Sequence, residues 1–184
     1  PISPVQLSEL ATSIGSSIYS LEAEIDESML NAAYALYEKD VALGGKLDYD
    51  DLVTLKNKTK MSDLYLTDEK GIFTTSTEKK SIGMGLYDIW DGYKMLMTKE
   101  ATILPSDFKI KAETGTIFKF TAIPRAEGRG IIESALDASK IEAYLQSYIT
   151  DASGLQALYL FDSNNTVLIE TLKEGYQSEY KKGE

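Results

Sequence analysis

The side chains best suited to chemistry lie between residues 87 and 137, and their types favour binding over reaction. Tyr87, Trp90 and Tyr93 follow one another at steps of three, so they line an aromatic cavity or pack in a core with the hydroxyls reaching water. Lys119 lies in an apolar run, where a buried ammonium needs a partner such as a carboxylate, unless the side chain snorkels to water. Arg125 has a forked guanidinium that suits carboxylates, although a surface arginine is the commoner case.

The composition excludes the familiar catalytic centres that depend on histidine or cysteine. The 184 residues contain neither residue, which removes disulfides, zinc–thiolate sites, Ser-His-Asp machinery and haem held by an axial histidine. The acidic pairs Asp50/Asp51 and Asp88/Asp91 have nothing that places them around a scissile bond. No Walker loop is present, and the run that starts at Asp162 lacks the glycine and the closing glutamate of an EF-hand. We therefore expect no catalytic residue, no metal and no cofactor.

The charge balance argues against nucleic acid as a partner. Acidic residues outnumber basic ones by 29 to 19, for a net charge of -10, whereas a nucleic-acid binder needs a concentrated basic face. The largest basic cluster, residues 56–60, is typical of a solvated turn. No run approaches the roughly 18–20 apolar residues of a membrane span, and a lack of cysteine suits an extracytoplasmic bacterial domain. We expect the chain to be the soluble part of a larger protein.

A long helix is the first element that the sequence predicts. Apolar residues recur with an 11-residue repeat, about 3.67 residues per turn, and the repeat is carried by Leu7, Leu10, Ile14, Ile18, Leu21, Ile25, Met29, Ala32 and Leu36. The pattern predicts one helix over about residues 5–41, which Gly44 and Gly45 end. Such a helix either packs on a core throughout or partly pairs with a second copy.

Strand signals follow the helix and a short helical stretch over residues 48–60. Residues 64–75 predict a hairpin whose turn uses Gly71, residues 83–97 are helical or loop and helix, and residues 108–123 predict a second hairpin. Strand alternation then predicts that seven residues share one face of this hairpin. They are Phe108, Ile110, Ala112, Ile117, Lys119, Thr121 and Ile123, and Lys119 is the only charged residue among them. With an even loop, Ile110 would oppose Lys119. The last strand, residues 131–136, leads into a helix capped by Asp137 or Ser139.

The end of the chain repeats the opening hairpin. Residues 158–162 (Leu-Tyr-Leu-Phe-Asp) match residues 64–68 (Leu-Tyr-Leu-Thr-Asp) at four of five positions, and a polar turn and an apolar strand follow both. An internal duplication is therefore predicted. The segment is either a truncated second module or an extra hairpin.

The order of these elements resembles the extracytoplasmic PAS-like sensor domains called Cache or PDC domains, found in bacterial chemoreceptors and sensor histidine kinases. The resemblance covers roughly residues 5–150 and rests on the runs at 64–73, 81–86 and 130–137. It implies an α+β fold in which a long N-terminal helix packs on an antiparallel sheet with flanking helices. It also implies that a small carboxylate or amino acid binds between the sheet and the segment after the first hairpin.

Carried over by position, the resemblance implies a ligand site built from seven residues: Tyr87, Trp90, Tyr93, Lys119, Thr121, Arg125 and Asp137. In members that sense amino acids, an aspartate at the end of the last strand holds the ligand amine, and Asp137 has the matching place. Those members also carry an Arg-x-Trp-Tyr segment before the third strand. Here residues 87–93 (Tyr-Asp-Ile-Trp-Asp-Gly-Tyr) lack the arginine.

The resulting hypothesis is a non-catalytic sensor domain, outside the cytoplasm, of a membrane receptor that binds a small ligand and moves its long helix. We divide the chain into a signalling or dimerising helix (1–41), a PAS-like sensor domain (42–150) and a repeat-like hairpin, partial second module or linker (151–184). The receptor would be anchored in the membrane through segments outside this chain. Two alternatives remain: a ligand-free structural module with a filled core, and a cytoplasmic PAS domain that binds a protein.

Overall fold

The computed structural model describes residues 2–111, 114–150 and 154–184. The helices are α1 (Pro4–Ala42), α2 (Tyr49–Thr59), α3 (Leu86–Ile89), α4 (Lys94–Thr98) and α5 (Ser139–Gln146), with short 3-10 turns η1 (Lys79–Ser81), η2 (Asp91–Tyr93) and η3 (Ala126–Gly128). The strands are β1 (Asp63–Thr67), β2 (Phe73–Ser76), β3 (Leu104–Pro105), β4 (Lys109–Ile110), β5 (Ile117–Pro124), β6 (Ile131–Asp137), β7 (Ala157–Phe161) and β8 (Val167–Leu172). The predicted α+β class is confirmed.

The chain forms two compact units. We call residues 25–106 and 119–136 the sheet unit, and residues 1–24, 107–118 and 137–184 the hairpin unit. The division passes through α1, so the first part of this helix belongs to the hairpin unit and the rest to the sheet unit. The module boundaries drawn from the sequence, at 41/42 and 150/151, stay a prediction.

The long helix matches its predicted bounds closely. It runs from Pro4 to Ala42, and two residues of positive φ, Gly44 and Gly45, follow it. The backbone N–H of Gly45 bonds to the carbonyl of Asp40 at 2.8 Å, which closes the last turn. A side chain at such a φ is strained, so the two glycines fix the end of the helix.

A reciprocal cap begins the next helix. The carboxylate of Asp48 accepts the backbone N–H of Asp51 at 2.9 Å, and the carboxylate of Asp51 accepts that of Asp48 at 3.3 Å. This capping box satisfies N–H groups that the helix itself leaves unbonded. Helix α2 therefore starts at Tyr49, within one residue of the predicted start.

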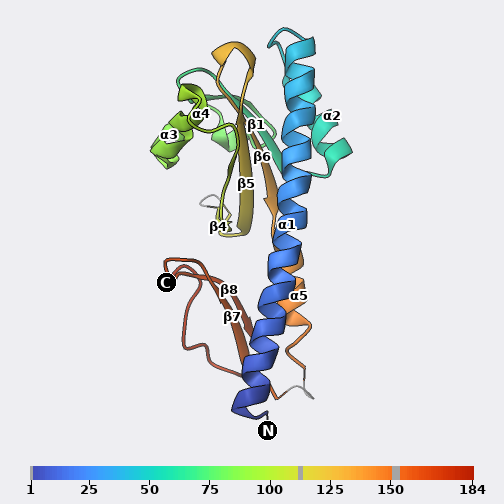
Figure 1. Ribbon diagram of the computed structural model, residues 1–184, viewed down its shortest axis with the longest axis vertical. Coiled ribbons are helices and arrows are strands. Elements are labelled where there is room, and N and C mark those ends of the chain that lie inside the picture. The colour runs from blue at the N-terminus through green and yellow to red at the C-terminus, as the bar shows by residue number, and fades with distance from the viewer. Residues whose placement is uncertain (1, 112–113, 151–153) are drawn as a thin grey trace. The chain divides into compact units, whose positions relative to one another are not determined.

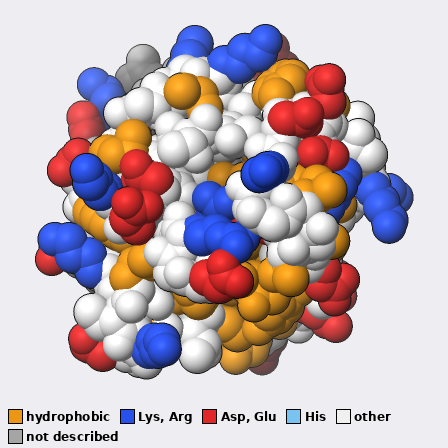
Figure 2. All heavy atoms as spheres, turned by 90° about the horizontal axis from the view of Figure 1, so that it is seen from above, with side chains coloured by type: hydrophobic (Ala, Val, Ile, Leu, Met, Phe, Trp, Pro, Cys, Tyr) orange, Lys and Arg blue, Asp and Glu red, His pale blue; other side chains and the backbone are white. Residues whose placement is uncertain are grey.

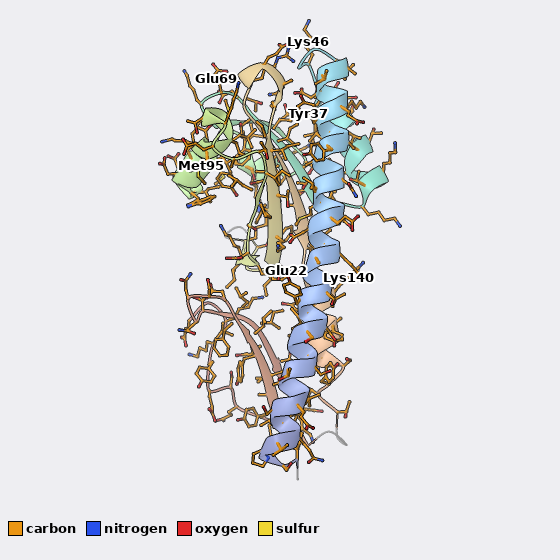
Figure 3. The ribbon with its side chains drawn as sticks, in the orientation of Figure 1. Glu22, Tyr37, Lys46, Glu69, Met95 and Lys140 are labelled. Atoms are coloured by element: carbon orange, nitrogen blue, oxygen red, sulfur yellow. The ribbon has the colours of Figure 1, made fainter. Side chains whose placement is uncertain are left out.

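The central sheet is antiparallel, with the strand order β2-β1-β6-β5-β3 and with β4 also paired to β5. In the sheet unit, α1 covers one side of these strands, and α3 and α4 lie on the other side (Figure 1). The core between α1, α2 and the sheet contains Met29, Ala32, Ala33, Leu36, Leu47, Leu52, Leu55, Met61, Leu64, Leu66, Ile123 and Ile132. Tyr37, labelled in Figure 3, packs against this core.

The predicted register of the second hairpin is wrong by two residues. Ile110 opposes Ile117, and Lys109 opposes Phe118, whereas the prediction paired Ile110 with Lys119. The reason is the loop closure, in which the N–H of Lys111 bonds to the carbonyl of Thr116 at 2.7 Å. A shift of two preserves side-chain alternation, so the predicted grouping of Ile110 and Ile117 on one face remains. Ala112 lies outside the described residues.

The hairpin unit contains α5 and the two-stranded sheet β7-β8. The helix α5 begins at Ser139, and its N-cap position is Ala138 rather than Asp137 or Ser139. The Asp137 carboxylate nevertheless accepts the N–H of Ser139 at 2.5 Å, so it satisfies a group in the first turn from one residue further upstream.

The two hairpins that share a similar five-residue run also share a geometry. In β1–β2, Leu66 opposes Thr75 and then Thr67 opposes Phe73, so the register shifts between them. In β7–β8, the shift lies at the same place, with Leu160 opposite Ile169 and Phe161 opposite Val167. Each of the three pairs in the first hairpin recurs in the second with both partners 94 residues further along the chain.

An aspartate at the equivalent position closes the turn of each hairpin. The Asp68 carboxylate accepts the N–H groups of Lys70 and Ile72, both at 2.9 Å. The Asp162 carboxylate accepts those of Asn164 and Thr166, both at 2.8 Å. This side-chain cap over a tight turn supports the duplication that the sequence predicts.

Candidate functional site

The sheet unit has two distinct faces because successive residues of a strand point to opposite sides. Leu64, Leu66 and Ile132 face α1, since they belong to its core. The residues between them point the other way, and register pairs Tyr65 with Glu133 on that side. We call this second side, covered by residues 84–98, the aromatic face.

Residues 84–98 are attached to the first hairpin by its own backbone. Gly85 forms an antiparallel bridge with Ile72. The N–H of Leu86 donates to the carbonyl of Gly71 at 2.7 Å, and the N–H of Phe73 donates to the carbonyl of Met84 at 3.0 Å. The aromatic segment therefore starts as a short extension of the hairpin.

Tyr87 lies against the turn of the first hairpin. Its ring covers Gly71 so closely that a Cβ on this glycine would lie 2.6 Å from a ring carbon. Burial, with the nearby charge of Asp68, raises the pKa of Tyr87, and Lys94 opposes this shift. The Lys94 ammonium lies 5.7 Å from the ring centroid. The buried hydroxyl has no hydrogen-bond partner among the described residues, and a buried hydroxyl of this kind is costly unless water or a ligand meets it.

Trp90 and Tyr93 differ sharply in exposure. Trp90 is 46% exposed and Tyr93 is 4% exposed, and their rings meet edge to face with centroids 5.3 Å apart. Trp90 also covers Gly92, where a Cβ would lie 2.2 Å from the indole. Tyr93 thus anchors the segment to the sheet, while Trp90 presents an indole surface to the outside.

Glu133 is a residue of the aromatic face that the sequence reasoning missed. It is buried in the middle of β6 and hydrogen-bonds the hydroxyl of Tyr93. Burial, together with the charge of Glu133 and that bond, raises the pKa of Tyr93. The sequence signal that could have identified Glu133 is a charged residue within the apolar run 131–136. The pairing of β6 with β1 decides which face of the sheet this residue occupies.

The basic residues of the predicted site contact α1 instead. The Lys119 ammonium lies 2.5 Å from the Asp26 carboxylate. The Arg125 guanidinium donates to both carboxylate oxygens of Asp40, at 2.8 and 2.9 Å. It also donates to the carbonyls of Thr67 at 2.9 Å and Gly45 at 3.2 Å.

Thr121 lies between these two basic residues on β5, and alternation gives it the same side as Lys119. It is buried, and its hydroxyl has no hydrogen-bond partner in the described part of the chain. Asp137 belongs to the hairpin unit, where its carboxylate caps Ser139.

The seven predicted residues are therefore divided by the structure. Tyr87, Trp90 and Tyr93 share one short segment over the aromatic face, whereas Lys119 and Thr121 lie on the side of α1. Arg125 is held by Asp40 of α1. A contact between these residues and a ligand stays a prediction, and the geometry favours the three aromatic residues with Glu133.

On the face drawn in Figure 2, blue and red side chains are interspersed, and basic residues do not gather into one area. Within the described ranges, no group of three or more acidic side chains is placed to hold a metal ion. None of the helices described is both long and apolar enough to cross a bilayer.

Solved structures of sensor domains share this fold, although no family profile and no curated protein matches the sequence. The ligand-binding domain of the Pseudomonas aeruginosa amino acid chemoreceptor PctC, solved with GABA, aligns with a TM-score of 0.59 and 18% identity, over 89% of this chain and 73% of that one. The sensor domain of the Vibrio cholerae histidine kinase DctB gives 0.57 and 17%, over 90% and 67%.

A third structure, an extracellular ligand binding receptor from Desulfohalobium retbaense, aligns with a TM-score of 0.63 and 15% identity. The alignment covers 91% of this chain and 31% of that receptor, so the chain spans less than a third of its length. This chain therefore has the fold of these ligand-binding and sensor domains, which is the fold expected from the resemblance to Cache or PDC domains.

Proposed function

We propose that this chain is the sensing domain of a bacterial membrane receptor and binds a small ligand at the aromatic face, outside the cytoplasm. The receptor would be a chemoreceptor or a sensor histidine kinase, anchored in the membrane by segments outside this chain. The observation that carries the proposal is the fold shared with the ligand-binding domain of a chemoreceptor and the sensor domain of a histidine kinase.

The aromatic face supplies groups of the kind that a small ligand needs. Trp90 offers a half-exposed aromatic surface, and the Tyr87 hydroxyl is a buried polar group with no partner among the described residues. Binding sites usually combine aromatic walls with a few placed polar groups. We expect the ligand to be a small amine, carboxylate or amino acid, by analogy with the GABA complex.

The ligand-free alternative predicts a core filled by Trp90 with Phe118 or Phe120. Trp90 is 46% exposed, which is far from the burial expected of a side chain that fills a core. This observation favours the sensor over the structural module.

A thermal-shift screen of the purified chain against amino acids, amines, carboxylates and sugars tests the proposal. A ligand at 100 times its dissociation constant should stabilise the fold by about 2.7 kcal/mol. Trp90→Ala should reduce the shift, and Tyr49→Ala, at a 40% exposed aromatic residue of α2, should preserve it. A shift of equal size in both variants would remove the aromatic face from the site, and silence across the library would favour a ligand-free module.

We also propose that β7 and β8 open a second module of the same fold. Their register and their aspartate turn reproduce those of β1 and β2 at an offset of 94 residues. The edge of β7 away from β8 would take a strand that corresponds to β6, as β1 does. In this chain, the β7 amides that point away from β8 should exchange their hydrogens rapidly. In a longer version of the protein that contains the added strand, the same amides should be protected from exchange.

Pairing of two copies through α1 is the third part of the proposal. The helix exposes large apolar side chains at Val5, Tyr19, Tyr34 and Val41, which water solvates poorly. Light scattering after size exclusion should report a dimer for the receptor's sensor region, and Tyr19→Glu should shift it to monomer. A monomer at all concentrations would contradict this part alone.

A further inference from the structure

Two ion pairs connect α1 to β5 and to the residue that directly follows this strand in the sheet unit. Lys119 pairs with Asp26, and Arg125 pairs with Asp40. Three of the four side chains are nearly or fully removed from solvent, since Lys119, Arg125 and Asp40 are 2%, 9% and 0% exposed. A buried charge needs its partner because the interior solvates it poorly.

The spacing of the partners matches along both elements. Asp26 and Asp40 are fourteen residues apart, which is about 21 Å along a helix at 1.5 Å per residue. Lys119 and Arg125 are six residues apart, which is about 20 Å along a strand at 3.3 Å per residue. Both pairs can therefore form together in one register of the helix along β5, and this is the register observed.

We propose that the two pairs act as a register latch, which makes residues 25–42 of α1 and strand β5 move as one body. A slide of the helix by one turn, about 5.4 Å, would separate Lys119 and Arg125 from their carboxylates at the same time. The movement that carries a signal along α1 then tilts or rotates the helix together with the sheet and does not slide it past the sheet.

Further contacts hold the same register. The Ser134 hydroxyl donates to the backbone carbonyl of Met29 at 2.8 Å. This hydrogen bond connects β6 to α1 at a point between the two ion pairs. Arg125 holds the end of β1 through the Thr67 carbonyl and the loop after α1 through the Gly45 carbonyl. The latch thus includes the three central strands, and it does not depend on which ligand is sensed.

Either pair alone should be enough to set the register, and this gives the test. The chain has no native cysteine, so spin labels at Asn31→Cys, an exposed position of α1, and Thr74→Cys on β2 report one distance. Lys119→Met alone and Asp40→Asn alone should each keep the single narrow distance of the parent. The two changes together should add a second population, displaced by about one helical turn.

A matched control uses the neighbouring ion pair of the same helix. Lys39 bonds to Asp51 of α2 at 2.6 Å and is partly exposed, so Lys39→Met with Lys119→Met should keep the single distance. If Asp40→Asn fails to fold, Arg125→Lys takes its place, since a lysine cannot bridge both carboxylate oxygens and the two carbonyls. A folded double variant with the parent's distance, or a second population in Lys119→Met alone, would overturn the latch.

Discussion

The hairpins β1–β2 and β7–β8 have the same register, equivalent aspartate turns and nearly the same five residues before the turn, yet they differ in burial. All five residues of β1 are buried, whereas four residues of β7 are half-buried and Phe161 is 41% exposed. The first hairpin pairs with β6 on its second edge and carries the aromatic segment on its turn. The comparison teaches that local sequence sets the hairpin and that its neighbours set its burial.

The largest expected difference is at a pair of equivalent leucines. Leu66 is 1% exposed and Leu160 is half-buried. Leu66→Ala should lower the free energy of unfolding by about 3 kcal/mol, and Leu160→Ala by about 1 kcal/mol, because a fully buried site loses more contacts and leaves a cavity. Urea denaturation of both variants measures the two losses. Equal losses would mean that β7 is covered in solution as completely as β1.

Removing the turn aspartate should lower the free energy of unfolding by the same amount in both hairpins. Asp68→Ala and Asp162→Ala each remove an acceptor for two backbone N–H groups, which should cost roughly 1–2 kcal/mol. Asparagine keeps an acceptor oxygen, so Asp68→Asn and Asp162→Asn should recover part of the loss. Thermal unfolding is the measurement, and a large loss at only one of the two sites would break the equivalence of the turns.

Alkaline pH should lower the stability that Tyr93 contributes where the aromatic segment packs on the sheet. The pKa of Tyr93 is raised in the fold by burial and by Glu133, so its neutral form is favoured there. The associated stability is complete below the unfolded pKa of about 10 and is lost as the pH rises above it, by about 1.4 kcal/mol per unit. Urea midpoints between pH 8 and 11 should fall less for Tyr93→Phe than for the parent. Parallel curves would show that Tyr93 does not control the alkaline loss.

The smallest effect concerns the turn residue of positive φ, which is Gly71 in one hairpin and Asn165 in the other. Asn165→Gly should change stability by less than about 0.5 kcal/mol, since both residues tolerate this conformation. Gly71→Asn should cost about 1 kcal/mol because its Cβ would meet the ring of Tyr87. Gly71→Asn with Tyr87→Ala should recover this cost, and no recovery would show that the ring is not the obstacle.

The sequence predicts the local elements well because their causes are local. The 11-residue repeat gives α1 within one residue at each end, and the aspartate-to-glycine turn gives the first hairpin. The duplication is visible for the same reason, since residues 64–68 and 158–162 contain their own turn signal.

The composition of the site could not be predicted in the same way, because distant pairing decides it. Lys119 was predicted to need a partner such as a carboxylate, and the carboxylate that the structure places beside it belongs to Asp26, 93 residues away on α1. Glu133 was overlooked, since its face depends on which residue of β1 opposes it. A charged residue in an apolar strand predicts a buried partner, and the sequence leaves open which of two sides supplies it.

The exposure of Trp90 gives this molecule a fluorophore at one known place. It is the single tryptophan of the chain, it lies at the outer side of the aromatic segment, and its ring meets that of Tyr93 edge to face. Excitation at the red edge of the absorption spectrum would therefore select one indole, and its emission colour would report how wet that surface is. Any compound that settles on it would shift the emission to the blue, without a dye or an added label.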